Sequence, residues 1–297
     1  MSQNIICYGE VLWDVFPSGL KKIGGAPLNV ALRLKTMGCH SGLITKVGDD
    51  HLGKELIDYV AAQELPIETF QKDKTYKTGE VLVHLDASGT ASYTISKDVA
   101  WDYIQLTENI KNKVSEADAF IFGTLAARSE VSRVTLMALL DLAKFRVLDV
   151  NLRPPHYTKE ILEIVLQKAD FIKMNDEELF EIVNLFGFES RDEKECILHV
   201  VKKFETKQIC VTRGSKGAIL YTNGSFYNHP GYKVKVVDTV GAGDTFLATL
   251  LIQILQGQNP DTALDYASAL GAMVAGSEGA NPNFTKQEIT AFMQSLF

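Results

Sequence analysis

Residues 237–246 read Val-Asp-Thr-Val-Gly-Ala-Gly-Asp-Thr-Phe, and this stretch says most about the fold of the chain. We expect a strand to end near Val237 and a long apolar helix to follow over about residues 242–255. Gly241 and Gly243 leave the backbone free to turn successive N–H groups toward one anion, where the helix dipole favours negative charge. The segment therefore predicts an anion-binding turn at a helix N-terminus.

Asp244 lies in the first turn of that predicted helix, and the residues alone leave two interpretations open. Aspartate is common at helix starts, where its carboxylate caps backbone N–H groups. A carboxylate beside an anion-binding turn also suits a general base, which takes the proton from a hydroxyl that attacks a phosphoryl group.

A second glycine-rich segment, residues 24–29 (Gly-Gly-Ala-Pro-Leu-Asn), opens a predicted helix over residues 27–37. It lacks the Gly-x-Gly-x-x-Gly spacing, so a dinucleotide site, and with it a nicotinamide-dependent oxidoreductase, is disfavoured. The paired glycines form either a tight turn or a surface where a polyol approaches the backbone closely, with Asn29 beside it.

A third segment, residues 48–55, comes close to a P-loop but departs from it in two ways. Glu55 stands where the hydroxyl ligand of Mg²⁺ is required, and Asp49 and Asp50 would repel phosphate. We expect instead a helix over about residues 53–63 whose first acidic residues complement the helix dipole.

Short apolar runs alternate with helix-length segments along almost the whole chain. Most of these runs are continuously apolar, as expected of parallel strands that are covered on both faces. Their order predicts an α/β fold with a doubly wound, mostly parallel sheet and helices on both faces. The strands are expected at residues 4–8, 43–47, 119–122, 147–150, 171–174 and 209–212.

Residues 78–96 break this rhythm, because apolar and polar side chains alternate there. Residues 86–89, Asp-Ala-Ser-Gly, are a turn signal between two such runs, which predicts an antiparallel hairpin. Residues 11–16 are expected to add a further strand. We therefore predict one domain for the 297-residue chain, with a small antiparallel β lid inserted from about 11–22 and 76–100.

The composition excludes several classes of partner. Thirty Lys and Arg stand against 37 Asp and Glu, a net charge of −7, so no nucleic-acid partner is expected. The longest apolar run is shorter than the ~20 residues of a bilayer span, and no basic, apolar leader opens the sequence. We therefore expect a cytoplasmic protein with no membrane partner. The four cysteines and six histidines show no metal-binding spacing.

The segments at 24–29 and 238–245 together resemble the two signatures of the ribokinase/PfkB family of sugar kinases, in the expected order and about 210 residues apart. Three further stretches resemble the family, so the likeness covers nearly the whole chain. Residues 175–178 resemble its N-x-x-E motif, residues 212–217 its strand-turn-strand that meets the nucleotide, and residues 279–283 its closing loop near a monovalent-cation site. The resemblance implies a ribokinase-like fold.

The resemblance also implies roles for individual residues of this sequence. Asp244 would be the base, backbone N–H groups of Gly241, Ala242 and Gly243 would hold the transferring phosphoryl group, and Arg153 would add positive charge. The other implied roles are sugar binding by Asp14, Gly24, Gly25 and Asn29; placement of ATP and Mg²⁺ by Asn175, Glu178, Thr212, Gly214 and Gly217, with Glu178 reaching Mg²⁺ through water; and a K⁺ site at Asp238, Gly279 and Asn283.

The implied reaction is the transfer of the γ-phosphoryl group of ATP to the primary hydroxyl of a monosaccharide. Residues 24–29 and residues 149–155, Asp-Val-Asn-Leu-Arg-Pro-Pro, look most like bacterial fructokinases, which favours conversion of fructose to fructose 6-phosphate. Ribokinase, 2-keto-3-deoxygluconate kinase and nucleoside kinase activities of the same family remain alternatives, as does a non-catalytic sugar sensor. In related kinases such lids sometimes pair between subunits, so a homodimer through the lid is also implied.

Overall fold

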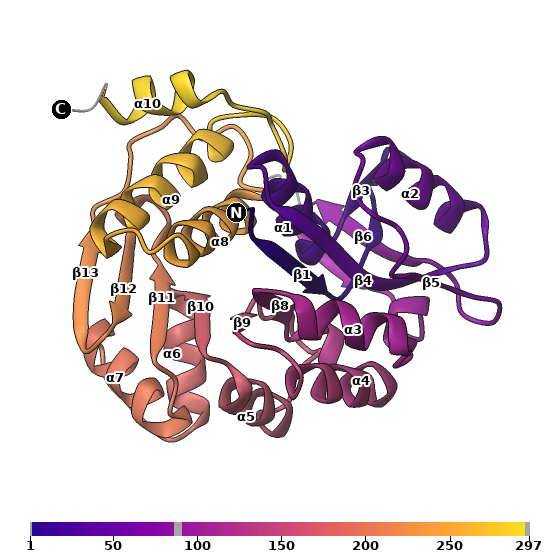
Figure 1. The fold of residues 1–297 in the computed structure, drawn as a ribbon, viewed down its shortest axis with the longest axis horizontal. Helices are drawn as coiled ribbons and strands as arrows, with labels where there is room; N and C mark the ends of the chain where they lie inside the picture. The colour runs from indigo at the N-terminus through magenta and orange to yellow at the C-terminus, as the bar shows by residue number, and fades with distance from the viewer. Residues whose placement is uncertain (1, 86–90, 295–297) are drawn as a thin grey trace.

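A mostly parallel sheet forms the centre of the computed structural model, which describes residues 2–85 and 91–294. Its strand order within these residues is β13-β12-β11-β10-β9-β8-β1-β4-β5 (Figure 1). Neighbours from β11 to β5 run parallel, and β12 and β13 at one edge run antiparallel. The strands are β1 Asn4–Tyr8, β4 His40–Gly48, β5 Phe70–Asp73, β8 Ala119–Gly123, β9 Arg146–Asp149, β10 Phe171–Asn175, β11 Gln208–Thr212, β12 Ala218–Thr222 and β13 Ser225–His229.

Helices connect the strands and pack on both sides of the sheet, as predicted for a doubly wound fold. They are α1 Ala26–Thr36, α2 His51–Ala62, α3 Glu108–Glu116, α4 Glu130–Leu140, α5 Lys159–Lys168, α6 Asp176–Leu185, α7 Glu193–Phe204, α8 Ala242–Leu255, α9 Pro260–Ala275 and α10 Lys286–Gln294.

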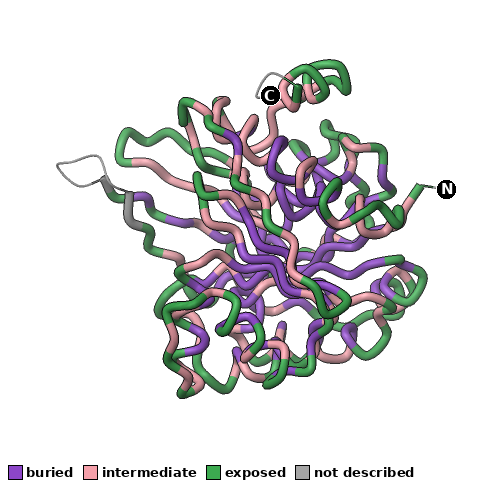
Figure 2. The backbone as a smooth tube through the Cα atoms, turned by 90° about the vertical axis from the view of Figure 1, so that its left-hand side faces the viewer, coloured by how far each residue is buried: buried purple, intermediate pink, exposed green. Residues whose placement is uncertain are grey.

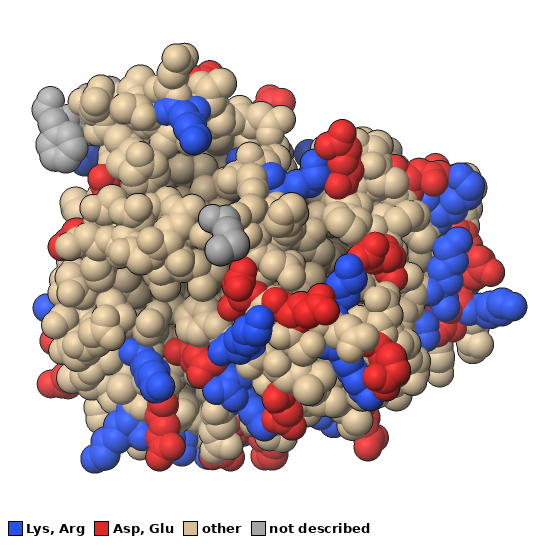
Figure 3. Space-filling model, in the orientation of Figure 1, with Lys and Arg blue, Asp and Glu red and all other residues tan. Residues whose placement is uncertain are grey.

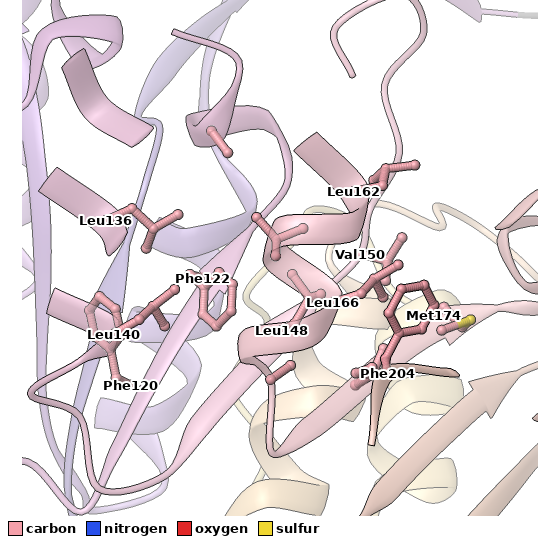
Figure 4. Packing of buried hydrophobic residues seen from close by; sticks show 14 of the residues in the cluster. Phe120, Phe122, Leu136, Leu140, Leu148, Val150, Leu162, Leu166, Met174 and Phe204 are labelled. Carbon is pink, nitrogen blue, oxygen red and sulfur yellow. The ribbon is translucent and has the colours of Figure 1, made fainter. Parts of the chain in front are cut away.

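Alternate residues of each strand point to opposite faces of the sheet, so each face carries its own apolar layer. These two layers hold the helices against the sheet. In β1, Ile5 and Cys7 belong to the layer under α1, α2, α8 and α9. Ile6 and Tyr8 belong to the layer under α3 to α7, part of which is shown in Figure 4. Figure 2 shows the buried residues gathered along the central strands, with exposed residues on the outer helices and loops. This explains why the strands read as continuously apolar.

A second, smaller sheet lies where the lid was predicted and is called the lid below; its strand order in the described residues is β3-β2-β6-β7. The hairpin of β6 and β7 is antiparallel, as predicted, and β2 is the predicted further strand. β2 pairs in parallel with β6 and antiparallel with β3, a strand that begins with two lysines and that we did not predict. The predicted turn at residues 86–89 lies outside the described residues. The lid strands are β2 Leu12–Val15, β3 Lys21–Gly24, β6 Gly79–Leu85 and β7 Ala91–Ile95.

The prediction of a strand ending near Val237 is wrong. The last strand of the main sheet ends at His229, and residues 230–241 form no strand. Val236 and Val237 are exposed, and the Val237 N–H donates to the carbonyl of Ala275 at the end of α9. The segment is therefore anchored to a helix end, and its β-branched residues find no neighbouring strand. The predicted helix after it is confirmed as α8.

The near-P-loop at residues 48–55 begins α2, as expected. The Asp50 carboxylate caps this helix: it accepts the N–H groups of Gly53 at 2.8 Å and of Thr78 at 2.9 Å. An aspartate therefore occupies the position that a phosphate would take in a P-loop.

Charged side chains of both signs are interspersed on the face shown in Figure 3, without a broad basic surface there. Among the helices of the described residues, none combines the length and the apolar character needed to cross a bilayer.

Candidate active site

The N-terminus of α8 forms the turn that the glycines predicted. Gly241 is the residue before the first helical turn and has a φ of +77°, a conformation that favours glycine. A Cβ at this position would collide with the backbone of Ala280, so the turn packs closely against the C-terminal loop of residues 279–284. Within the described residues, no side chain caps α8. The Ala242 N–H donates to the Thr239 carbonyl at 3.3 Å, and the remaining first-turn N–H groups are placed to receive an external anion.

Asp244 lies at this helix end and contacts Asn29 of α1. Asn29 Nδ2 donates a 2.8 Å hydrogen bond to Asp244 Oδ2, which joins the two glycine-rich segments. Burial, together with the nearby Asp149, raises the pKa of Asp244 to about 6, even though Lys173, the hydrogen bond from Asn29 and Arg153 act to lower it. A carboxylate with this pKa is ionised at neutral pH and still basic enough to accept a proton.

A buried ion pair lies directly behind the turn. Lys173 Nζ is 2.9 Å from Asp149 Oδ1, and a Cβ added to Gly243 would come within 3.3 Å of the same ammonium. Burial disfavours the charged form of Lys173, but the carboxylates of Asp149, Glu178 and Asp244 outweigh it and raise the lysine pKa. Gly243 therefore leaves room for a positive charge next to the anion-binding turn.

The lid and the start of α1 bring together the residues predicted to bind the sugar. A Cβ on Gly24 would lie 2.5 Å from Asp14 Oδ2, and one on Gly25 would lie 2.5 Å from the Glu10 carbonyl oxygen. Gly25 also has a φ of +119°, so both the backbone angle and the lack of space exclude a side chain there. Burial raises the pKa of Asp14 to about 6, opposed by the charges of Arg153 and Lys22.

Two further charged residues lie near these carboxylates. Glu10 was not predicted as a site residue, and Arg153 was predicted to add positive charge near the phosphates. Glu10 is 4% exposed at the end of β1, and burial raises its pKa to about 7. Arg153 is exposed, and its positive charge lowers the pKa of Glu10, Asp14 and Asp244. It thus stands close to the carboxylates of both halves of the site.

A small cavity lies behind these carboxylates, at the carboxyl ends of β1, β8 and β9. It is lined by Glu10, Pro27, Thr124, Asp149 and Asn151 among others, and its free space of about 20 Å³ holds about one water molecule. Clefts at the carboxyl ends of parallel strands are the usual ligand sites of open α/β sheets.

Asn175 and Glu178 form a reciprocal cap at the start of α6. Asn175 Oδ1 accepts the Glu178 N–H, and Glu178 Oε2 accepts the Asn175 N–H, both at 2.8 Å. Glu178 Oε1 also accepts the Leu152 N–H at 2.7 Å, which fixes the loop that carries Arg153. Each carboxylate oxygen keeps one lone pair, which suits contact with a metal through water rather than a direct bond.

Thr212, Gly214 and Gly217 lie at the end of β11 and in the turn that follows it. Thr212 is opposite Asn175 in the sheet register, so this turn flanks the start of α6. Gly217 has a φ of +83°, and a Cβ there would collide with the His229 carbonyl. In the described residues, no hydrogen bond or ion pair joins Thr212, Gly214 or Gly217 to Asp244.

The residues of the implied K⁺ site lie on two adjacent loops. Asp238 Oδ1 accepts the Val240 N–H at 3.0 Å, Gly279 has a φ of +78°, and Asn283 is exposed. The contact of Gly241 with Ala280 brings these loops together. No group of three or more His, Cys, Asp or Glu side chains suited to a metal occurs in the described residues. A cation here would need backbone carbonyl oxygens.

Three residues near the site were not predicted from the sequence, namely Glu10, Lys173 and Asn281, and only Lys173 had a local signal. It is a charged residue inside the apolar run of β10. Asn281 Nδ2 donates to Asn29 Oδ1 at 3.3 Å, a contact between residues 252 positions apart.

A model of the pfkB family of carbohydrate kinases matches residues 6–287. Among curated proteins, the fructokinase of Klebsiella pneumoniae is 29% identical to this chain, covering 94% of it and 95% of the relative. Fructokinase-2 of Zea mays is 28% identical, covering 94% and 90%.

Solved structures show the same architecture. A sugar kinase from Pyrococcus horikoshii in complex with ATP superposes with a TM-score of 0.80 at 29% identity, covering 93% of each chain. A fructokinase from Xylella fastidiosa with bound ATP superposes with a TM-score of 0.86 over 99% of each chain, although only 22% of the residues are identical. With the anion-binding turn, the Asn29–Asp244 pair and the lid in place, the chain belongs to the pfkB family of carbohydrate kinases.

Proposed function

We propose that this chain transfers the γ-phosphoryl group of ATP to the primary 6-hydroxyl of fructose and releases fructose 6-phosphate and ADP. One observation carries the proposal: the Asp244 carboxylate, held by Asn29, lies at the uncapped N-terminus of α8. A base for the hydroxyl and donors for the phosphoryl oxygens thus meet at one point.

The chemistry follows from this arrangement. Asp244 takes the proton from the attacking hydroxyl as its oxygen bonds to the γ-phosphorus and the bond to the β-phosphate oxygen breaks. The N–H groups of Gly241, Ala242 and Gly243 hold the negative charge of the phosphoryl oxygens, and the Lys173 ammonium adds positive charge behind Gly243. Removing donors of this kind costs on the order of 10²–10³ in rate.

Sugar binding is assigned to the lid side of the site. Asp14 and Asn29 accept and donate hydrogen bonds to hydroxyls, and Gly24 and Gly25 let the ring approach the backbone. Closure of the lid over the sugar would exclude water as a competing phosphoryl acceptor. Glu10, Asp14 and Asp244 place three buried or partly buried carboxyl groups around the sugar side of the site, which favours a neutral polyol over a sugar acid such as 2-keto-3-deoxygluconate.

Mg²⁺ and K⁺ are the cations that fit the site. Mg²⁺ keeps most of its waters in proteins, and Glu178 has one lone pair free on each oxygen for such a water. Asp149 Oδ2, buried without a partner among the described residues, is a second acceptor for it. Mg²⁺ bound with ATP supplies positive charge at the β- and γ-phosphates. Asp238 and carbonyls near Gly279 and Asn283 would hold K⁺ beside the turn.

The relatives support this proposal. The Klebsiella and maize proteins are named fructokinases, and the kinase from Pyrococcus was solved with ATP. An intact turn with Asp244 in place favours a kinase over a non-catalytic sugar sensor.

A coupled assay of ADP release over a panel of sugars tests the function. Fructose, ribose, 2-keto-3-deoxygluconate and nucleosides are compared with and without Mg²⁺, and with K⁺ or Na⁺. We expect the highest kcat/KM for fructose. Another preferred sugar would refute the choice of fructose, and no ADP release with any sugar would refute the kinase assignment.

We also propose that the lid pairs between two copies of the chain. Its edge strands β3 and β7 have unpaired backbone groups, and Leu82 and Tyr93 of the hairpin are exposed. Light scattering should give a dimer, and Tyr93→Lys should give a monomer. A wild-type monomer at micromolar concentration would refute the pairing.

A further inference from the structure

Arg33, in α1, is a buried cation without a counter-ion. Arg33 is 2% exposed, and none of the ion pairs in residues 2–85 and 91–294 includes its guanidinium. Burial lowers its pKa to about 10, so the guanidinium is still charged at neutral pH. Burying an unpaired guanidinium is unfavourable, which calls for a role that a neutral side chain could not fill.

The neighbours of Arg33 lead to the candidate base. Arg33 is one helical turn after Asn29 on the same face of α1. Its Nε donates a 3.0 Å hydrogen bond to Oγ1 of Thr245, the residue that follows Asp244 in α8. Its guanidinium carbon lies 6.0 Å from the centre of the Phe284 ring, at the end of the C-terminal loop. Arg33 therefore touches both elements that flank the pair of Asn29 and Asp244.

Two polar atoms around this contact are buried without partners. Arg33 Nη2 is a donor and Asn281 Oδ1 is an acceptor, and neither has a hydrogen-bond partner in the described residues. Asn281 also donates to Asn29, while Phe284, three residues later, packs on Arg33. A complementary donor and acceptor thus lie on facing segments, α1 and the C-terminal loop.

We propose that Arg33 is a positioning residue for Asp244: it holds the loop of residues 279–284 against α1, so that Asn281 braces Asn29 and Asn29 orients the base. In the ligand-bound enzyme, Arg33 Nη2 donates to Asn281 Oδ1 and completes the chain of contacts. The inference rests on the proposed function, because it takes Asp244 as the base.

Arg33 acts through contact rather than through its charge. The charges that shift the pKa of Asp244 are those of Asp149, Lys173 and Arg153. The hydrogen bond from Asn29 lowers the Asp244 pKa. If Asn29 is held less firmly, that bond weakens, and the Asp244 pKa rises.

The test compares Arg33→Met and Arg33→Lys with Lys35→Met, a change in the same helix at a surface lysine paired with Glu64. We expect Arg33→Met to lower kcat by about 10- to 100-fold, as for a misplaced catalytic group. KM for ATP should stay nearly unchanged, and the acid limb of the kcat/KM profile should move to higher pH. Arg33→Lys should recover part of the rate, and Lys35→Met should behave as wild type.

A second variant tests the partner of Arg33. Asn281→Ala should lower kcat and move the acid limb in the same direction, and adding Arg33→Met should cost little more, because both changes break one chain of contacts. If Arg33→Met does not fold, Arg33→Lys and Asn281→Ala carry the test.

The outcomes separate this inference from the proposed function. An active wild type in which Arg33→Met matches Lys35→Met, or in which the acid limb stays in place, would overturn the positioning role. Independent, additive losses would overturn the link to Asn281. A wild type that phosphorylates no sugar would instead overturn the proposed function.

Discussion

Replacing Asp244 with asparagine should strongly lower the activity and stabilise the fold at the same time. Burial and the neighbouring Asp149 raise the pKa of Asp244 from 3.8 to about 6. The ionised carboxylate is therefore less favourable in the folded chain than in the unfolded one. Asparagine has a similar shape and can still accept the hydrogen bond from Asn29 through its own Oδ1.

The size of the stability gain follows from linkage. A rise of about two pKa units corresponds to about 3 kcal/mol, and because Asp244 keeps part of its surface exposed we expect between about 2 and 3 kcal/mol. The folded pKa is raised, so the ionised group destabilises the fold fully above about pH 6. The penalty shrinks as the pH falls toward the unfolded value, to about half at pH 5.

Urea unfolding of wild type and Asp244→Asn at pH 8 and pH 5 measures this difference, and ADP release measures the activity. We expect the variant to be more stable at pH 8, to lose about half of that advantage at pH 5, and to lose on the order of 10²–10⁴ in kcat. If the difference in stability between the variant and the wild type were the same at the two pH values, Asp244 would carry no burial penalty. Turnover near that of wild type would show that it is not the base.

Three further predictions follow from the geometry of the site. The kcat/KM of the wild type should fall about tenfold per pH unit below pH 6, as Asp244 becomes protonated, and a limb near pH 4 would contradict the raised pKa. Lys173→Met should destabilise the fold by about 3–5 kcal/mol in chemical denaturation, because it leaves Asp149 buried without its cation; a loss below about 1 kcal/mol would show that the pair is not buried in solution. Gly241→Ala should cost both stability and activity, since it adds a Cβ collision to a positive φ. Gly257 lies past the far end of α8 with a φ of +70° and open space around it, so Gly257→Ala should cost less. Similar losses for the two glycine variants would mean that only the backbone angle matters.

Much of the fold was accessible from local patterns. The continuously apolar strands, the helix after residue 241 and the hairpin of β6 and β7 follow from the periodicity and turn residues of short segments, and each is confirmed. β3 escaped prediction because Lys21 and Lys22 are exposed at a sheet edge, and the strand near Val237 is absent because no neighbouring strand pairs with it.

The sequence by itself determined the two glycine-rich segments and the aspartate beside one of them, since glycine and carboxylate chemistry at a helix start is a local property. Only the tertiary structure decided what surrounds that aspartate. It brings Asn29 to Asp244 across 215 residues and places Lys173 behind Gly243. It buries Glu10 and Arg33 next to the site as well. The physical reason is that pKa values and hydrogen-bond partners depend on desolvation and on distances between side chains, which packing sets and neighbouring residues in the chain do not reveal.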